Sequence, residues 1–475
     1  MTVPTAAATV PGGNTAERAD DMTVPAADTP PEGSMVPCTL LVVHPSDTSL
    51  VVVAATGRPP VAPAFKERYG FTPEALITAA RDATGLETFL LRQLPDNDAD
   101  GHPCPVLAPR DGGVTLADGL AWSTGPTGHP QADAVLAELS GAPVHPLRPA
   151  WSRREFLAEV TGWTADRLAA AGTPLTAPLE QVQSWQMSCV WRATTPAGLF
   201  YVKATAPSPL FAQEGTATAM VARLFPGQAP TPVAVDPERH WMIVPDLGPE
   251  LTWKASDEDV LDMIRAFARL QVASAAHVEE LLSGGCVERR LPWLVDHVTR
   301  WLTGADLSGY VDDPDRAARL RTLAADLPGH LDRLRGFGLP DTLLHGDLHP
   351  GNVARAADGY AYFDWSDASV GHPFVDMFTI RRITDPGRRE ARLAAYLGEW
   401  RAFGTPERLR AAWDAADLFT ALHHAVSYAS IVANLEPPPE PDLHAEVGVW
   451  LNHAIDAAAR WPLDAREAGQ AATAR

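Results

Sequence analysis

The sequence has few cysteines, no recognisable secretion signal and no long apolar run, and these features argue against a disulfide-rich, a secreted and a membrane-spanning protein. Its four cysteines form no C-x-x-C pair, so we expect neither a disulfide framework nor a zinc site and infer a reducing, cytoplasmic location. No basic start followed by an apolar run opens the chain, so no secretory signal is expected. No stretch approaches about 18 uninterrupted apolar residues, so no membrane-spanning helix and no membrane partner are expected.

Positive charge is scarce as well. The chain has 38 lysine and arginine residues against 59 aspartate and glutamate residues, a formal net charge of -21 at pH 7. Such a surface repels phosphate, so we expect no nucleic-acid partner, whereas it suits a cationic small molecule. Acidity that serves only solubility explains the charge equally well. Only Lys66, Lys203 and Lys254 are lysines, and a lysine retained among so many arginines indicates a need for a compact point charge.

The composition varies along the 475 residues in a way that predicts several domains. The first 36 residues are rich in Ala, Thr, Pro and Gly, which is typical of a disordered tail. In the linker, Trp151, Phe156 and Trp163 fall on a helical pattern and are expected to pack on the lobe that follows. The predicted divisions are a tail at 1–36, a small α/β domain at 37–145, a helical linker at 146–180, a β-rich lobe at 181–248, a helical lobe at 249–462 and a second tail at 463–475.

The predicted front domain combines strands with one well-marked helix. The run TLLVVHPSDTSLVVVAAT is typical of a hairpin, and a helix is expected from Pro73 to a stop at Gly85. A strand pair followed by a helix ending in ATGLE resembles the Nudix hydrolase arrangement. That resemblance implies metal-binding glutamates at three positions that hold Ala83, Asp82 and Ala79 here. With one carboxylate of three, we expect a degenerate Nudix-like domain that docks or regulates.

A lysine and a glutamate stand out in the predicted β-rich lobe. CVWRATTPAGLFYVKAT is typical of a hairpin turning at TPAG, and Lys203 shares the face of Leu199 and Tyr201 on its second strand. Glu214 lies on the apolar stripe of the next helix, which we expect to begin at Pro209. A carboxylate there needs a cation to offset its desolvation, and Lys203 is the nearest in the sequence. Phosphoryl transferases use such a pair to hold nucleotide phosphates.

The densest group of polar side chains lies in LLHGDLHPGNV, residues 343–353. Its glycines and proline exclude a regular helix, so the loop doubles back and can bring Asp347 and Asn352 toward a shared centre. Asp364, in the following YFDWSD, supplies a further carboxylate. Phosphoryl transfer needs a carboxylate that orients the attacking hydroxyl, and oxygen ligands for magnesium. A surface turn with capping residues is the alternative that this segment alone leaves open.

Together, LLHGDLHPGNV and YFDWSDASVGHPFVD resemble the catalytic segment of the aminoglycoside phosphotransferase and choline kinase group. The resemblance spans roughly residues 182–460. It implies an α+β, bilobal protein-kinase-like fold, with a β-rich N-lobe and a helical C-lobe, preceded by the small front domain. It also implies Mg²⁺-dependent transfer of the γ-phosphate of ATP or GTP to a hydroxyl of a small molecule.

The resemblance further implies roles for individual residues. Asp347 is implied to be the catalytic base, and Asp376 to brace the catalytic loop. The implied ligands of Mg²⁺ and of the nucleotide are Asn352 and Asp364 for the metal, Lys203 paired with Glu214 for the phosphates, and the carbonyl of Val244 and the amide of Asp246 for the nucleobase.

Two departures from the family pattern bear on function. The loop expected to cover the phosphates, QSWQMSCV, has no glycine, so backbone amides and the hydroxyl of Ser184 or Ser188 would have to bind them. Gly346 stands where protein kinases carry an arginine, and no A-P-E follows, which favours a small-molecule acceptor over a protein. The glycine-free loop leaves open an alternative, a catalytically weak or inactive nucleotide-binding regulatory protein.

Three further side chains near the loop are expected to be structural. His345 and His349 are expected to pack or hydrogen-bond so that they shape the loop. Asp367 either assists the metal or caps the following turn, and we favour the cap.

Overall fold

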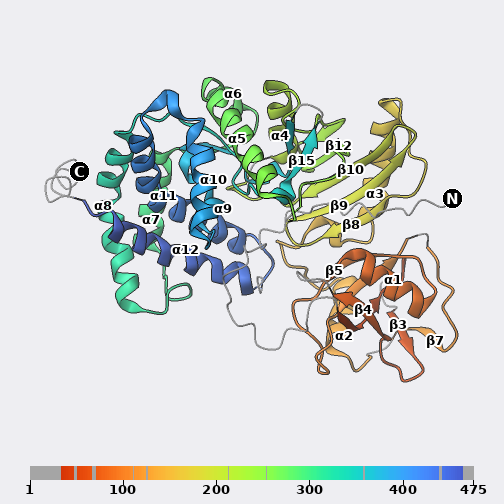
Figure 1. Ribbon diagram of the computed structural model, residues 1–475. Helices are drawn as coiled ribbons and strands as arrows, with labels where there is room; N and C mark the ends of the chain where they lie inside the picture. The colour runs from red at the N-terminus through yellow and green to blue at the C-terminus, as the bar shows by residue number, and fades with distance from the viewer. Residues whose placement is uncertain are drawn as a thin grey trace.

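The computed structural model describes residues 34–47, 51–66, 71–110, 112–124, 127–211, 213–252, 254–356, 359–437 and 441–463. Figure 1 shows the front domain beside a β-rich lobe, with the helical lobe beyond. Nearly all of both predicted tails lies outside the described residues. Strand β1 begins at Ser34 and pairs with β4 through Ser34↔Lys66, so residues 34–36 belong to the front domain and not to a tail.

The front domain is built from short strands and two helices. Strands β1 and β4 pair, β2 and β5 flank β6, and β3 pairs with β7. The predicted hairpin is therefore largely wrong, because its two runs pair with other strands and meet only at the bridge Val43↔Val51. The elements are β1 (Ser34–Thr39), β2 (Leu41–Val42), β3 (Val51–Ala54), β4 (Val61–Lys66), α1 (Pro73–Thr84), β5 (Thr88–Gln93), β6 (Pro105–Pro109), β7 (Leu120–Ser123) and α2 (Pro130–Leu139).

Helix α1 begins and ends where the sequence predicts. The side chain of Thr72 accepts a hydrogen bond from the amide of Ala75, and Pro73 occupies the first turn. Gly85 ends the helix with φ 74°, a left-handed conformation that glycine adopts without steric cost. The resemblance of this domain to Nudix hydrolases stays a prediction.

The N-lobe is a five-stranded antiparallel sheet in the order β11-β12-β10-β9-β8. Lys203 lies on the central strand, opposite Val190 of β9 and Met242 of β12. Helix α4 begins at Glu214 and not at Pro209, because Ser208 and Phe211 close a separate turn through their backbones. The elements are β8 (Glu180–Ser184), β9 (Ser188–Thr195), β10 (Gly198–Thr205), α4 (Glu214–Leu224), β11 (Ala234–Asp236) and β12 (Trp241–Pro245).

The linker helix α3 (Phe156–Ala170) packs on this sheet, as predicted. The rings of Phe156 and Trp163 lie 5.4 Å and 5.5 Å from the ring of Trp241 on β12. The front domain shares the same apolar core, in which Phe89 of β5 contacts Trp191 of β9. The front domain is thus fixed to the N-lobe through a common core.

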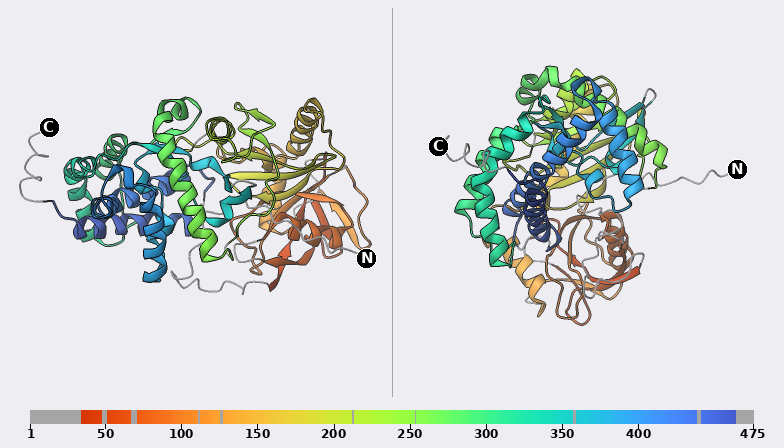
Figure 2. Two further views of the ribbon diagram at one scale, coloured as in Figure 1. Left: turned by 45° about the horizontal axis from the view of Figure 1, so that its top comes forward. Right: turned by 60° about the vertical axis from the view of Figure 1, so that its left-hand side comes forward.

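The C-lobe is mainly helical, and its long helices α11 and α12 pack along one another (Figure 2). None of the helices in the described ranges is long and apolar enough to cross a bilayer. The elements are α5 (Asp257–Ser274), α6 (Val278–Ser283), β13 (Val287–Glu288), α7 (Leu291–Gly304), α8 (Pro314–Arg335), β14 (Thr342–Leu344), β15 (Val353–Ala356), β16 (Gly359–Tyr362), β17 (Ser369–Gly371), α9 (Phe378–Arg381), α10 (Pro386–Gly398), α11 (Pro406–Ala433) and α12 (Pro441–Arg460).

Two short antiparallel ladders in the C-lobe position the polar loops. β14 pairs with β17, with Leu344 opposite Ser369, and β15 pairs with β16, with Val353 opposite Tyr362. The segment between β14 and β15 and the segment between β16 and β17 therefore leave the ladders at neighbouring points. These two segments contain HGDLHPGN and FDWSD.

Candidate active site

The loop that follows β14 is held from below by Asp376. Its carboxylate accepts hydrogen bonds from the amides of His345 at 2.8 Å and Gly346 at 2.7 Å, as the predicted bracing role requires. Gly346 has φ 85°, and a Cβ at this position would lie 2.4 Å from the Cβ of Asp367. Only glycine fits here, because both the backbone conformation and the space exclude a side chain.

The loop closes on itself between the two residues that the sequence singled out. The side-chain amide of Asn352 donates to the backbone carbonyl of Asp347 at 2.9 Å. Its other atom, Oδ1, is buried and has no hydrogen-bond partner among the described residues. An unpartnered buried carbonyl oxygen is costly unless a ligand or ion satisfies it.

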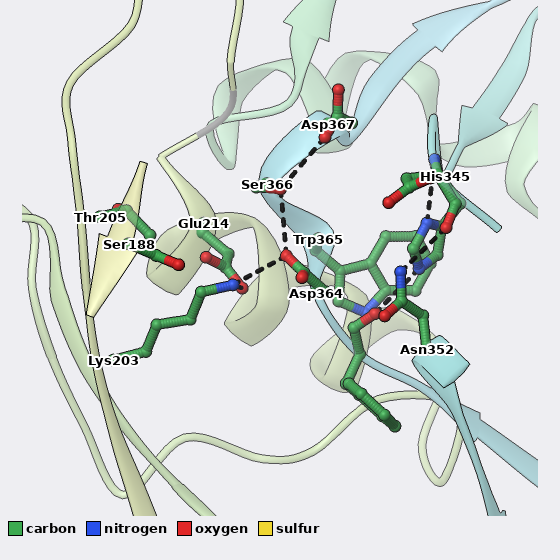
Figure 3. A network of polar contacts seen from close by, with 12 residues as sticks. Ser188, Lys203, Thr205, Glu214, His345, Asn352, Asp364, Trp365, Ser366 and Asp367 are labelled. Carbon is green, nitrogen blue, oxygen red and sulfur yellow. Dashed lines mark hydrogen bonds and ion pairs between the residues drawn. The ribbon is translucent and has the colours of Figure 1, made fainter. Parts of the chain in front are cut away.

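Lys203 bridges two carboxylates from different segments (Figure 3). Its ammonium lies 2.9 Å from Oε1 of Glu214, the first residue of α4, and 2.7 Å from Oδ1 of Asp364. Burial alone would lower the pKa of Lys203, but the two carboxylates outweigh it and hold the pKa above its ordinary value. The predicted Lys203–Glu214 pair therefore forms, with Asp364 as a third member.

Asp364 is held in an unusual backbone conformation. Its φ of 62° is left-handed, which is uncommon outside glycine and costs about 1–3 kcal/mol. Burial would raise the pKa of its carboxyl, but the charge of Lys203 and the hydrogen bond from Lys203 lower it below its ordinary value. Asp364 is thus an ionised carboxylate aimed at the lysine.

The two histidines of the loop are structural, as expected. His345 is buried between the rings of Phe267 and Trp365, and its Nε2 lies 3.0 Å from the carbonyl oxygen of Phe363. Burial lowers the pKa of His345 to about 4, so the ring is neutral. His349 accepts a hydrogen bond from the amide of Gly351 through Nδ1, while its Nε2 lies 3.7 Å from Oδ2 of Asp347.

Asp367 faces the cleft between the lobes, and the predicted turn cap is wrong. The hydroxyl of Ser366 donates to Asp364 and to Asp367, at 3.1 Å in each case. Burial, and then the charge of Asp347, raise the pKa of Asp367 to about 8. The signal in the sequence was a second acid three residues after Asp364. The residues that line the cleft are Trp185, Met187, Ser188, Lys203, Thr205, Ala206, Phe211, Asp347, Asp364, Ser366, Asp367 and Ile431.

The residues that were predicted to contact the nucleotide differ in whether the structure leaves them available for that contact. Ser188 lines the cleft at the start of β9, and its hydroxyl accepts a hydrogen bond from the indole of Trp185 at 2.8 Å. Val244 lies on β12, opposite Tyr201. The amide of Asp246, however, donates to the carbonyl of Leu199 at 3.0 Å. It is already used within the fold, so a nucleobase contact by this amide is not supported.

Residues 188–419 match the model of the phosphotransferase enzyme family, whereas no curated protein matches the chain. Similar solved structures include a choline/ethanolamine kinase family protein from Mesorhizobium loti, with 18% identity over 66% of this chain and 99% of that chain and a TM-score of 0.44. A choline kinase from Streptococcus pneumoniae has 13% identity over 64% and 100% of the two chains, with a TM-score of 0.45. A macrolide 2′-phosphotransferase from Brachybacterium faecium has 20% identity over 58% and 99%, with a TM-score of 0.41.

The family match confirms three predictions from the sequence: the family itself, the two-lobed α+β kinase-like fold and a phosphotransferase as the class of enzyme. Residues 188–419 match the model of this family, and they make up just under half of the chain.

Proposed function

We propose that the protein transfers the γ-phosphate of ATP or GTP to a hydroxyl group of a small molecule, with Mg²⁺ as cofactor. The observation that carries this proposal is the contact of Lys203 with both Glu214 and Asp364, in a cleft that Asp347 also lines. A lysine anchored by a helix glutamate, beside a carboxylate and a separate base, is the arrangement that phosphoryl transfer requires.

Asn352 and Asp364 fit the role of magnesium ligands. The orphaned Oδ1 of Asn352 and the ionised carboxylate of Asp364 are hard oxygen donors, which Mg²⁺ prefers. When bound, Mg²⁺ would neutralise charge on the phosphate oxygens. Lys203 supplies a further positive charge, and its two carboxylate partners fix where its ammonium points.

Asp347 acts as the base in this proposal. Its carboxylate orients the acceptor hydroxyl and takes its proton, while the hydroxyl oxygen bonds to the γ-phosphorus. The bond between that phosphorus and the oxygen bridging to the β-phosphate breaks, and the nucleoside diphosphate leaves. Asp347 is suited to this role because Asn352 donates to its backbone carbonyl and the carboxylate of Asp376 holds the amide of Gly346, the residue before it.

The acceptor is a small hydroxylated molecule, and we favour one that carries a positive charge. Asp347 and Asp367 both face the cleft, and the net charge of the chain is -21. The acidic groups next to the reacting centre attract a cationic acceptor, whose charge would also favour the ionised form of Asp367, and they discriminate against an anionic acceptor.

The test compares the wild-type protein with the Asp347→Asn variant. Candidate acceptors are first screened by thermal shift in the presence of Mg²⁺ and a non-hydrolysable nucleotide, and transfer to the hits is then measured. We expect Mg²⁺-dependent transfer that falls by a factor of about 10²–10⁴ in the variant, with unchanged nucleotide binding. Full transfer by the variant would remove Asp347 as base. Nucleotide binding by the wild type without turnover of any acceptor would favour the regulatory alternative.

A further inference from the structure

The loop between β8 and β9 is tied directly to the C-lobe. Gln186, at its tip, makes two hydrogen bonds with the backbone of Glu436, which follows α11. Its Oε1 accepts from the amide of Glu436 at 2.7 Å, and its Nε2 donates to the carbonyl of Glu436 at 3.4 Å. Because Trp185, Met187 and Ser188 of this loop line the cleft, these bonds hold the loop across it.

The side chain of Glu436 is in turn held by Arg148 of the linker. The guanidinium of Arg148 donates to both carboxylate oxygens of Glu436, at 2.5 Å and 2.6 Å. It also donates to both oxygens of Glu138 on α2, at 3.0 Å and 3.2 Å. Glu138 receives a further ion pair from Arg92 of β5 at 2.6 Å. A chain of charges therefore runs from the front domain to the C-lobe, and we call Gln186, Glu436, Arg148 and Glu138 the clasp.

Arg148 is the member on which the clasp depends. It lies between two carboxylates, and its side chain is 12% exposed, against 26% for Glu138 and 22% for Glu436. Burial, and then the charge of Glu436, raise the pKa of Glu138. Without Arg148, Glu138 and Glu436 would repel one another across a poorly solvated contact. Its removal would therefore push the segment after α11 away from the front domain and release Gln186.

The side-chain hydrogen bonds of Gln186 are the ones that join this loop to the C-lobe among the described residues. The loop contains no glycine, and Met187 also belongs to the apolar core that includes the C-lobe helices. Two other hydrogen bonds of the loop involve its own lobe and the linker: Trp151 donates to the carbonyl of Trp185 at 3.0 Å, and Trp185 donates to Ser188.

We propose that Arg148, Gln186 and Glu436 are positioning residues that hold the glycine-free loop closed over the donor phosphates, so that the linker and front domain set the affinity and release of the nucleotide. The inference rests on the proposed function, in which the cleft takes a nucleoside triphosphate. A loop already held in its binding position loses less conformational entropy when its backbone amides meet the phosphates.

The experiment compares Arg148→Ala with Arg153→Ala in the full chain. Arg153 is a matched control, because it is a linker arginine whose ion pair with Glu159 is exposed and includes no member of the clasp. Binding of AMP-PNP and GMP-PNP with Mg²⁺, and of adenosine and guanosine, is measured by calorimetry. Hydrogen exchange of the peptide covering residues 183–189 is measured without ligand.

We expect Arg148→Ala to weaken triphosphate binding about tenfold or more, which is the effect of losing one charge-assisted hydrogen bond. Nucleoside binding should stay unchanged, since the loop meets only phosphates, and a purely structural defect would weaken both. Exchange of the loop amides should rise. Gln186→Ala should have the same effect, and combining it with Arg148→Ala should add little, because both act through Glu436.

Equal triphosphate affinity and equal loop exchange in Arg148→Ala and Arg153→Ala would overturn the inference. If Arg148→Ala does not fold, Gln186→Ala decides the question, because it removes both bonds to Glu436 and leaves the ion pairs of Arg148 intact. Weaker triphosphate binding with unchanged nucleoside binding would support the inference, and unchanged triphosphate binding would overturn it. If the wild-type protein binds neither triphosphate, the proposed function fails, while loop exchange still shows whether the clasp holds the loop.

Discussion

Replacing Lys203 by methionine tests the centre of the site most directly. Lys203 is 11% exposed in its side chain, and its two partners, Glu214 and Asp364, are 2% and 10% exposed. Methionine fills a similar volume but carries no charge. The variant therefore leaves two carboxylates facing each other in a poorly solvated space, with no cation between them.

The expected loss of stability in Lys203→Met follows from the distances between the ammonium of Lys203 and its two carboxylate partners. At an effective dielectric constant of about 20, contacts of 2.9 Å and 2.7 Å correspond to about 6 kcal/mol of attraction each, before the desolvation of the charges is subtracted. Breaking a buried ion pair by removing one partner costs about 3–5 kcal/mol in practice. We therefore expect Lys203→Met to lower the free energy of unfolding by about 3–5 kcal/mol and to abolish phosphoryl transfer.

The assay is denaturant unfolding at pH 8, followed by phosphoryl transfer under the same conditions. Lys254→Met is the matched control, because this second lysine is exposed and should change stability by less than about 0.5 kcal/mol. Adding Glu214→Gln should change the free energy of unfolding in opposite directions in the wild type and in Lys203→Met. It should destabilise the wild type, but recover about 1–3 kcal/mol in Lys203→Met, because it removes an uncompensated buried charge.

A loss of less than about 1 kcal/mol in Lys203→Met would refute the reasoning, since it would mean that solvent or a rearranged neighbour satisfies both carboxylates. Equal destabilisation of both backgrounds by Glu214→Gln would refute it as well. Such a result would show that Glu214 and Lys203 do not interact.

Three further outcomes follow from the same geometry. Gly346→Ala should cost about 1–3 kcal/mol of stability and most of the activity, because its Cβ would lie 2.4 Å from the Cβ of Asp367. Gly57→Ala is the control, because Gly57 has φ 78° but open space around it, and it should cost less. Equal losses of stability in the two variants, measured by denaturant unfolding, would contradict the steric argument. Asn352→Ala should raise the Mg²⁺ concentration for half-maximal transfer about tenfold or more while nucleoside binding holds, and an unchanged Mg²⁺ titration would exclude Asn352 as a ligand. The pKa of His345 is about 4 in the folded protein against 6.5 when unfolded. The stability due to its neutral ring is therefore complete above pH 6.5, and about 3 kcal/mol of it is lost as the pH falls to 4. His345→Gln should flatten this dependence of the free energy of unfolding on pH, and an unchanged dependence would show that the ring is protonated in the folded protein.

Much of the site was predictable because its determinants are local. The ends of α1 follow from Thr72, Pro73 and Gly85, which lie next to the turns that they cap. The catalytic loop is contiguous in sequence, so its glycines and proline predict its reversal without knowledge of the rest of the fold. Pairing Lys203 with Glu214 also needed only chemistry, since a carboxylate on an apolar face requires a nearby cation.

The predictions that the structure does not support share one physical cause, which is competition for partners that are distant in sequence. The runs of the predicted hairpin, 39–43 and 51–56, have the right composition, but β6 and β7 offer them longer pairings. The amide of Asp246 is used by Leu199 of a neighbouring strand. Which way Asp367 points depends on how Gly346 packs against it.

By itself, the sequence determined the family, the reversal of the HGDLHPGN loop and the pairing of Lys203 with Glu214, because each depends on short-range spacing and residue chemistry. Only the tertiary structure decided how the glycine-free loop is held. Arg148 and Glu436 are 288 residues apart, and Gln186 and Glu436 are 250 apart. A contact over such a separation exists only when the packing of both lobes and the linker brings the charges together, and no local pattern in the chain records it.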